Sequence, residues 1–413
     1  MSDTLPLFRL THLIALSLLA LFLVACGGSA QPENTPTMEI AAATTAPTAT
    51  LSPAPSATPE PTATPTVVAL QSSPTFRHDS QHTGYWPGEP VLTLSETAWQ
   101  FQAEAEIHSS PVVVDGVVYF GSDDHNLYAL DLLTGVEKWR FPTNDIIFSS
   151  PTVLNGVIYV ASDGVYAVNT SDGTLVWHFT IPESPTILTQ ASPVVVGETL
   201  YIASGLGRLH ALDIATGQEK WQFALRGGST SSPAVADGLV YVGDRAGRFY
   251  AVNAATGELA WEFRAGSTIY ASPAIADGVV YIGSLDNNLY ALDALTGEEK
   301  WQVTGGAGFV SSASVVEGVV YVGNLDTHVY ALNALTGTEI WRFKTENSVY
   351  GSATVMEQAL YIGSDDGKLY ALDRATGTEL WQFDTGGIVY TTPAVVDGFV
   401  LFGSYSGLLV AVR

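Results

Sequence analysis

The chain has 413 residues, with 41 acidic and 16 basic side chains and a formal net charge of −25. Such a charge repels nucleic acid and anionic lipid head groups, which excludes both as main binding partners. The single cysteine, Cys26, has no second thiol in the chain with which to form a disulfide.

Residues 1–26 have the pattern of a secretory signal peptide. Arg9 precedes the apolar run LIALSLLALFLVAC, which is short for a membrane span and ends in small residues. Its last four residues, Leu23 to Cys26, resemble the lipobox of bacterial lipoproteins, and this resemblance implies cleavage before Cys26 and lipidation of its sulfur. A plain signal peptide or an N-terminal helix is the alternative. We therefore expect an exported lipoprotein, anchored in a membrane and exposed in the periplasm or on the cell surface.

Residues 27–75 are dominated by Pro, Thr, Ala and Ser, which predicts a disordered tether with a reach on the order of 100 Å. Residues 76–98 follow as a lead-in to the folded part. They contain His78, Asp79 and His82, whose spacing a metal could use, although a structural lead-in is the interpretation that we favour.

The rest of the chain is a repeat. Eight tryptophans are separated by 40, 38, 44, 40, 40, 40 and 40 residues, a period that indicates a repeat architecture. Each unit, such as residues 271–301, alternates short runs of Val, Ile, Leu and Tyr with turn residues, which predicts four β-strands. Asp-Gly or Asn-Gly pairs between the first two runs predict tight two-residue hairpins. The repeated tryptophans are Trp99, Trp139, Trp177, Trp221, Trp261, Trp301, Trp341 and Trp381.

The two ends of the repeat predict a closed ring. The eighth unit stops at Arg413 without a fourth strand, and an unpaired fourth strand containing Trp99 precedes the first unit. Pairing these two fragments would complete the last sheet and remove the exposed sheet edges of an open array. We predict an all-β fold over residues 99–413, an eight-bladed β-propeller of four-stranded antiparallel blades closed by the strand around Trp99.

The stretch ALDALTGEEKW, residues 291–301, recurs along the chain, with Asp172-Gly173 replacing Thr-Gly in the unit at residues 167–177. It resembles the tryptophan-docking motif of the PQQ-like, or quinoprotein, β-propeller repeat family. The resemblance implies a structural role in which each tryptophan packs, buried, between neighbouring blades. WD40 repeats fit less well because Asp never follows the repeated Trp.

The family includes dehydrogenases that use pyrroloquinoline quinone (PQQ) with calcium, held in pockets built by long insertions. Nearly every unit here has only the minimal length of 40 residues, and the folded part has no cysteine. We therefore expect no cofactor, neither PQQ nor calcium. The sequence also lacks the common hydrolase, zinc and nucleotide-binding motifs, so we expect no catalytic residue and no metal site, and we interpret the Asp-rich turns as turn chemistry.

Two sets of residues are candidates for binding. In a propeller, the loops leading into the first strands lie on the same face as the turns between second and third strands. A ring of side chains at the end of these loops would surround the mouth of the central channel, where aromatic groups can anchor a peptide, a sugar or a partner loop. Filling between the converging first strands is the alternative. The ring consists of His108, Phe148, Gln190, Thr230, Tyr270, Val310, Tyr350 and Tyr390.

The second candidate is a loop that departs from the repeat. The turn at Ser162-Asp163-Gly164 is two residues shorter than its equivalents, and the following loop, ending at Gln190, is four residues longer. Such departures often mark the binding side of a repeat protein, with neutral drift as the alternative. The candidate contact residues are Pro182, Glu183, Ser184, Pro185, Thr186, Ile187 and Leu188.

These observations favour a non-catalytic, lipid-anchored scaffold outside the cytoplasm that binds other proteins. In this respect the chain is similar to BamB, the lipoprotein propeller of outer-membrane β-barrel assembly, although the long tether departs from that pattern. The alternatives are a PQQ-dependent dehydrogenase and a carbohydrate-binding or sensing propeller. Membrane contact would come through the lipid alone.

Overall fold

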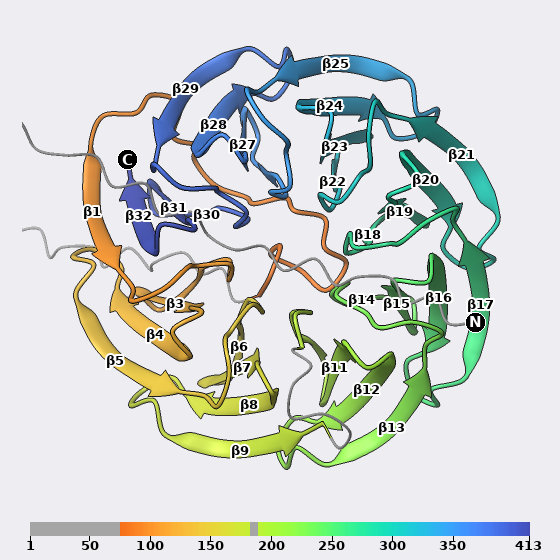
Figure 1. The fold of residues 1–413 in the computed structure, drawn as a ribbon, viewed down its shortest axis with the longest axis horizontal. Coiled ribbons are helices and arrows are strands. Elements are labelled where there is room, and N and C mark those ends of the chain that lie inside the picture. The colour runs from red at the N-terminus through yellow and green to blue at the C-terminus, as the bar shows by residue number, and fades with distance from the viewer. Residues whose placement is uncertain (1–74, 182–188) are drawn as a thin grey trace, which may run out of the picture. The chain divides into compact units, whose positions relative to one another are not determined.

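A computed structural model describes residues 75–181 and 189–413 (Figure 1). The signal peptide, Cys26, all but the last residue of the tether, and the contact loop at residues 182–188 lie outside the described residues. The described residues form eight four-stranded antiparallel sheets arranged in a ring, which confirms the predicted eight-bladed propeller. Within these ranges there is no helix of a length and hydrophobicity that would allow it to cross a membrane.

Each blade runs from a short inner strand to an outer strand, in chain order. Blade 1 consists of β2 (Val112–Val114), β3 (Val117–Gly121), β4 (Asn126–Asp131) and β5 (Glu137–Pro142). Blade 2 consists of β6 (Thr152–Leu154), β7 (Val157–Ala161), β8 (Gly164–Asn169) and β9 (Leu175–Thr180). Blade 3 consists of β10 (Val194–Val196), β11 (Thr199–Ser204), β12 (Arg208–Asp213) and β13 (Glu219–Ala224). Blade 4 consists of β14 (Ala234–Ala236), β15 (Leu239–Gly243), β16 (Arg248–Asn253) and β17 (Leu259–Arg264).

The second half repeats this order. Blade 5 consists of β18 (Ala274–Ala276), β19 (Val279–Gly283), β20 (Asn288–Asp293) and β21 (Glu299–Thr304). Blade 6 consists of β22 (Ser314–Val316), β23 (Val319–Gly323), β24 (His328–Asn333) and β25 (Glu339–Lys344). Blade 7 consists of β26 (Thr354–Val355), β27 (Ala359–Gly363), β28 (Lys368–Asp373) and β29 (Glu379–Asp384). Blade 8 consists of β30 (Ala394–Val396), β31 (Phe399–Gly403), β32 (Leu408–Val412) and β1 (Thr97–Gln102).

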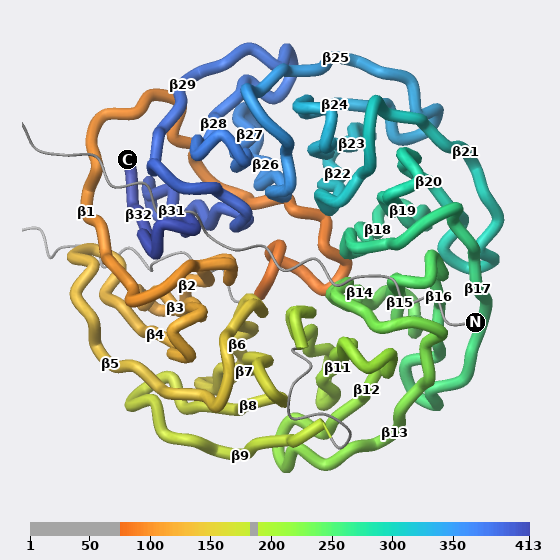
Figure 2. Tube along the Cα trace, viewed as in Figure 1, coloured from red at the N-terminus to blue at the C-terminus, as the bar shows by residue number. Residues whose placement is uncertain are grey.

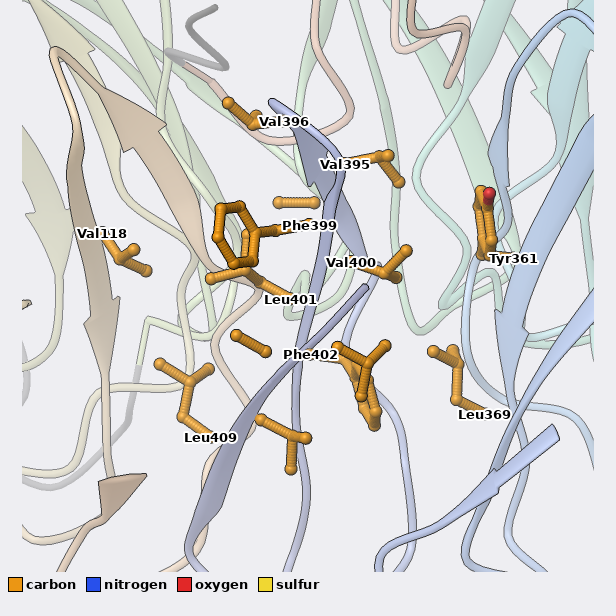
Figure 3. Close-up of a cluster of buried hydrophobic side chains, with 14 of the residues drawn as sticks. Val118, Tyr361, Leu369, Val395, Val396, Phe399, Val400, Leu401, Phe402 and Leu409 are labelled. Carbon is orange, nitrogen blue, oxygen red and sulfur yellow. The ribbon is translucent and has the colours of Figure 1, made fainter. Parts of the chain in front are cut away.

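Blade 8 closes the ring as predicted. The first strand of the chain, β1, pairs antiparallel with the last, β32, and places Trp99 opposite Ala411 and Phe101 opposite Leu409. The apolar core is continuous across this junction, because one buried cluster combines Val118 of blade 1 and Tyr361 of blade 7 with the side chains of blade 8 (Figure 3).

The propeller has two distinct faces. We call the face with the first-to-second-strand hairpins and the Thr-Gly turns the hairpin face; the Ala334 N–H of one such turn donates to the Gly318 carbonyl of a hairpin, 2.8 Å away. The opposite face, with the loops into the first strands, is the mouth face. The predicted hairpins have positive φ at both central residues, as at Asp277 (51°) and Gly278 (72°). Glu317 (49°) adopts the same conformation without the Asp or Asn that would signal it.

Each repeated tryptophan connects its blade to the next. The Trp301 indole N–H of blade 5 donates to the Ala334 carbonyl of blade 6 at 2.9 Å, and the Tyr281 hydroxyl of blade 5 donates to the same oxygen at 3.3 Å. The expectation that these indoles are buried holds only for Trp99 and Trp381. The other six, which like these two lie on outer strands, are half-buried.

The Thr-Gly turn provides the surface on which the indole rests. Gly297 has φ of 74°, and a Cβ atom at this position would lie 2.5 Å from the Trp261 ring of the preceding blade. Gly173, in the aberrant Asp-Gly unit, contacts Trp139 in the same way. Glycine is therefore required both by the backbone conformation and by the approach of the ring.

The lead-in replaces the turn that blade 8 lacks. The Trp381 indole N–H and the Tyr361 hydroxyl both donate to the Val91 carbonyl, at 2.8 Å and 3.1 Å. The sequence motif ends before this point, but the docking interaction continues around the whole ring.

The lead-in also crosses the centre of the ring before it reaches β1 (Figure 2). The inner-strand N–H groups of Val235 and Ile275 donate to the carbonyls of Ser80 and Gln81, at 2.7 Å and 2.9 Å. Arg77 is almost fully buried there, and burial lowers its pKa to about 9.

The metal alternative for His78, Asp79 and His82 has little support from these contacts. The Asp79 carboxylate accepts hydrogen bonds from the backbone N–H groups of Gln81 and Thr83, at 3.0 Å and 3.1 Å, and so closes a turn. Burial, followed by the charge of Arg77, lowers the pKa of His82 to about 3. These contacts support a structural role for residues 78–83.

The glycine beneath each indole provides a stability test. Gly278→Ala should cost about 1–2 kcal/mol, since it adds only backbone strain at a site with φ of 72° and no atom within 4 Å of the new Cβ. Gly297→Ala should cost about 1–3 kcal/mol more, because the methyl group overlaps the Trp261 ring. Urea unfolding of both variants measures the difference, and equal losses would contradict the docking role of Gly297.

Candidate binding site

A belt of hydroxyl groups fixes the inner rim of the propeller. In each blade, the residue two positions after the predicted mouth residue is a serine or threonine. Its backbone N–H donates to the hydroxyl oxygen of the equivalent residue in the next blade, in seven bonds of 2.8–3.1 Å. The belt consists of Ser110, Ser150, Ser192, Ser232, Ser272, Ser312, Ser352 and Thr392.

This belt was not among the predicted features, although a small hydroxyl residue before Pro or Ala recurs in every unit. The belt holds the loops that carry the mouth residues at fixed positions around the channel. Side chains on these loops are therefore supported by the inner strands rather than by mobile connections.

Five aromatic rings from blades 1, 2, 7 and 8 form a continuous series at the mouth, which we call the aromatic arc. The centroids of His108 and Phe148 are 3.8 Å apart, and those of His108 and Tyr405 are 4.2 Å apart. Tyr390 is 4.6 Å from Tyr405 and stacks on Tyr350 at 4.7 Å. The structure thus brings four of the predicted mouth residues together.

Tyr405 completes the arc, and it was absent from the predicted ring. It lies on the turn between β31 and β32, whereas the predicted residues lie on the loops into the first strands. Its position in the repeat could have revealed it. Tyr405 follows Ser404 at the start of the turn, as Asp123 follows Ser122, and this position also reaches the mouth. Burial and the charges of neighbouring groups raise the pKa of the Tyr405 hydroxyl.

Carboxylates surround the aromatic arc. Asp123 Oδ2 lies 3.3 Å from His108 Nε2, and Glu106 Oε2 lies 3.6 Å from the same nitrogen. Burial, followed by the charge of Asp366, raises the pKa of Asp365 to about 6, and the nearby Tyr390 hydroxyl opposes this rise. The mouth is therefore both aromatic and acidic.

The other predicted mouth residues lie outside the arc. Tyr270 is 40% exposed and has no ring contact with the arc among the described residues. Gln190 Oε1 accepts a hydrogen bond from Arg245 Nη2 at 3.5 Å. Thr230 and Val310 are half-buried, which suits the filling role considered as the alternative.

The Asp-rich turns separate into two groups. One group stabilises the turn itself, as Asp286 does by accepting hydrogen bonds from the Asn288 N–H at 2.9 Å and the Tyr290 hydroxyl at 2.8 Å. Asp123 and Asp365 lie one position earlier in their turns and contact the aromatic arc instead. Turn chemistry therefore accounts for the first group and not for these two carboxylates.

Known proteins share this architecture. A family model described as the beta-propeller of beta-alanine-activating enzyme matches residues 184–413, more than half of the chain. A second model, described as outer membrane protein assembly factor BamB, matches residues 94–232.

The chain belongs to the PQQ-like β-propeller family.

Solved PQQ-like propellers have the same fold. The structure of BamB from Moraxella catarrhalis has a TM-score of 0.64 and 19% identity, covering 77% of this chain and 97% of that one. The quinohemoprotein alcohol dehydrogenase from Comamonas testosteroni has a TM-score of 0.71 and 16% identity, covering 83% of this chain and 80% of that one. At these identities, the similarity concerns the fold of the PQQ-like propeller alone.

A curated relative is closer in sequence but matches a short segment. The serine/threonine-protein kinase AfsK of Streptomyces griseus is 32% identical over 156 residues, which is 35% of this PQQ-like propeller chain. The matched segment spans only 18% of the length of the kinase.

The raised pKa of Asp365 predicts a pH-dependent effect on stability. Because its folded pKa of about 6 exceeds the ordinary 3.8, the folded state binds more protons between these values, and stability falls as pH rises through this window. Asp365→Asn should therefore raise the melting temperature at pH 7, and the gain should vanish near pH 4. Thermal unfolding at both pH values measures this.

The neighbouring carboxylate is the control. Asp366 accepts hydrogen bonds from the Lys368 N–H and the Tyr370 hydroxyl, so Asp366→Asn should lower the melting temperature at pH 7. A loss of stability in Asp365→Asn at pH 7 would show that the Asp365 charge is compensated in the fold.

Proposed function

We propose that this protein is a non-catalytic scaffold outside the cytoplasm, anchored by lipid at Cys26, which binds other proteins through its mouth face. The observation that carries this proposal is the aromatic arc with its surrounding carboxylates. Large aromatic side chains provide most of the binding energy in many protein interfaces, particularly near their centres. The hydroxyl belt supports these side chains on a rigid rim, which limits the entropy lost on binding.

The chemistry of the mouth favours a partner segment that carries Lys or Arg. Tyr350 is 38% exposed and Asp365 lies within electrostatic reach of it. A cation can bind over an aromatic ring while it pairs with a nearby carboxylate. The overall charge of −25 also attracts a basic partner and speeds its association.

The residues at the mouth do not suit PQQ. The quinone carries three carboxylates, which would meet Glu106, Asp123 and Asp365 at the rim. The guanidinium of Arg245, which contacts Gln190, lies apart from the aromatic arc. We infer that the chain works without this cofactor and without the dehydrogenase activity of the quinohemoprotein relatives.

Carbohydrate binding is a weaker candidate. Sugars pack on flat, open aromatic faces, but Tyr350 and Tyr390 stack on each other at 4.7 Å with an interplanar angle of 27°, and Tyr405 packs against Tyr390. The rings of the arc therefore cover one another, while Tyr270 and part of Tyr350 stay exposed.

A crosslinking experiment tests the scaffold role. A photoreactive phenylalanine analogue at Tyr270, on the mouth face, should give discrete protein adducts in cells. The same analogue at Leu335, which is 84% exposed on the hairpin face, is the matched control and should give none of these adducts. The Tyr350→Ala/Tyr390→Ala variant should lose most of the adducts at position 270, because it removes two rings of the arc.

Three outcomes would count against this proposal. Adducts that persist in the folded double variant would exclude the aromatic arc as the contact. Adducts with glycans alone would favour carbohydrate binding. Bound-quinone absorbance and dye reduction after addition of PQQ and calcium would favour a dehydrogenase.

The anchor has a separate test. Cys26→Ser removes the sulfur that the lipid requires, so the variant should move from the membrane fraction to the soluble fraction. Fractionation followed by mass spectrometry of the N-terminal peptide measures this. Membrane association that survives Cys26→Ser would show that another element, and not a lipid, holds the protein.

A further inference from the structure

Three ligand-type side chains converge at one edge of the aromatic arc. His108 Nε2 lies 3.3 Å from Asp123 Oδ2 and 3.6 Å from Glu106 Oε2. Among the residues that the structure describes, this is the one group of three His, Cys, Asp or Glu side chains whose ligand atoms all lie within 4.8 Å of one another. Two segments of blade 1 supply it, the loop into β2 and the turn between β3 and β4.

The separations suit a shared cation better than direct hydrogen bonds. Charge-assisted N–H···O bonds are about 2.7–2.9 Å long, shorter than both distances here. In a tetrahedral site with bonds of about 2.0–2.2 Å, neighbouring ligand atoms are about 3.3–3.6 Å apart. The spacing from His108 to the two carboxylates falls in this range.

The site is held in place before any ion binds. The His108 ring lies between Phe148 and Tyr405, with centroids at 3.8 Å and 4.2 Å, which fixes the direction of Nε2. The Asp123 N–H donates to the Glu106 carbonyl at 3.0 Å, which joins the two segments of blade 1. Such support outside the ligand atoms is what orients ligands in protein metal sites.

One oxygen of this group is left without a partner. Asp123 Oδ1 is buried and makes no hydrogen bond within the described residues, while the whole Asp123 side chain is 15% exposed. A buried carboxylate oxygen without a partner is costly, and a cation bound through Oδ2 would neutralise the charge that the carboxylate spreads over both oxygens. The carboxylates of Glu106 and Asp123 together carry two negative charges, which a divalent cation would neutralise.

The geometry points to a divalent transition-metal site formed by Glu106, His108 and Asp123, with Zn²⁺ as the ion that suits it best. An imidazole nitrogen with carboxylate oxygens suits Zn²⁺ and its first-row neighbours, whereas Ca²⁺ takes six to eight oxygen ligands. Three protein ligands leave the fourth tetrahedral position open. The Glu106 side chain is 53% exposed, so the site can be reached from solvent, and a carboxylate or histidine of a partner can take the fourth position.

Calorimetry with ZnCl₂ and the full-length protein tests the site. We expect saturable Zn²⁺ binding that falls about 100-fold or more in His108→Phe and in Asp123→Asn, since changes to the supporting groups of metal sites already cost 10–100-fold. Phenylalanine keeps a ring between Phe148 and Tyr405 while it removes the ligand nitrogen. CaCl₂ should give no saturable heat at the same concentrations.

Two control variants separate coordination from charge. His328 Nδ1 lies 3.3 Å from Asp326 Oδ1 but belongs to no group of three, so His328→Phe should leave Zn²⁺ binding unchanged. Asp365→Asn removes one negative charge from the mouth and should change the affinity only a few-fold. Glu106→Gln, at an exposed side chain, keeps the test valid if the other two variants unfold, and it should weaken binding at least tenfold.

Absence of saturable Zn²⁺ binding in the folded protein would overturn the proposed site. Zn²⁺ affinities of Glu106→Gln and His108→Phe that equal the affinity of the unmodified protein would also rule the site out. Ca²⁺ binding as tight as Zn²⁺ binding would do the same.

Discussion

The whole propeller depends on one cross-blade interaction, in which two donors of one blade share a single carbonyl of the next. In the repeat that includes Ala334, the indole N–H of Trp301 and the hydroxyl of Tyr281 satisfy the same oxygen. Each repeated indole N–H has its acceptor outside its own blade, so no blade satisfies this donor alone. Neighbouring blades are therefore required for the stability of each blade, as in other repeat proteins.

The same interdependence shapes the centre of the molecule. The inner strands of blades 4 and 5 leave backbone N–H groups that would face the channel, and the lead-in accepts hydrogen bonds from them through Ser80 and Gln81. The lead-in therefore crosses the channel and pairs with its inner strands (Figure 2). The mouth face presents the aromatic arc on the hydroxyl belt, whereas the hairpin face presents exposed turn residues such as Leu335.

Much of the fold follows from the sequence because the docking motif marks each blade. The spacing of the tryptophans and the unpaired strand at Trp99 sufficed to predict eight blades and their closure through β32. The role of Val91 could not be predicted, because the interaction uses a backbone carbonyl that every residue has. Glu317 likewise adopts a left-handed turn that no Asp or Asn announces. The mouth was predicted only in part, since the grouping of Tyr405 with His108 depends on ring closure between distant segments.

Closure by β1 and β32 has a consequence for how the molecule forms. The first strand of the propeller pairs with its last, as in the register of Trp99 with Ala411. Contacts of such large sequence separation form slowly, since the intervening chain must be ordered before they are gained. During synthesis, β1 has no final partner until β32 has been made, whereas the lead-in can pair earlier with Val235 and Ile275. The nascent chain therefore carries an unpaired, aggregation-prone strand edge for longer than a protein that folds from its N-terminus.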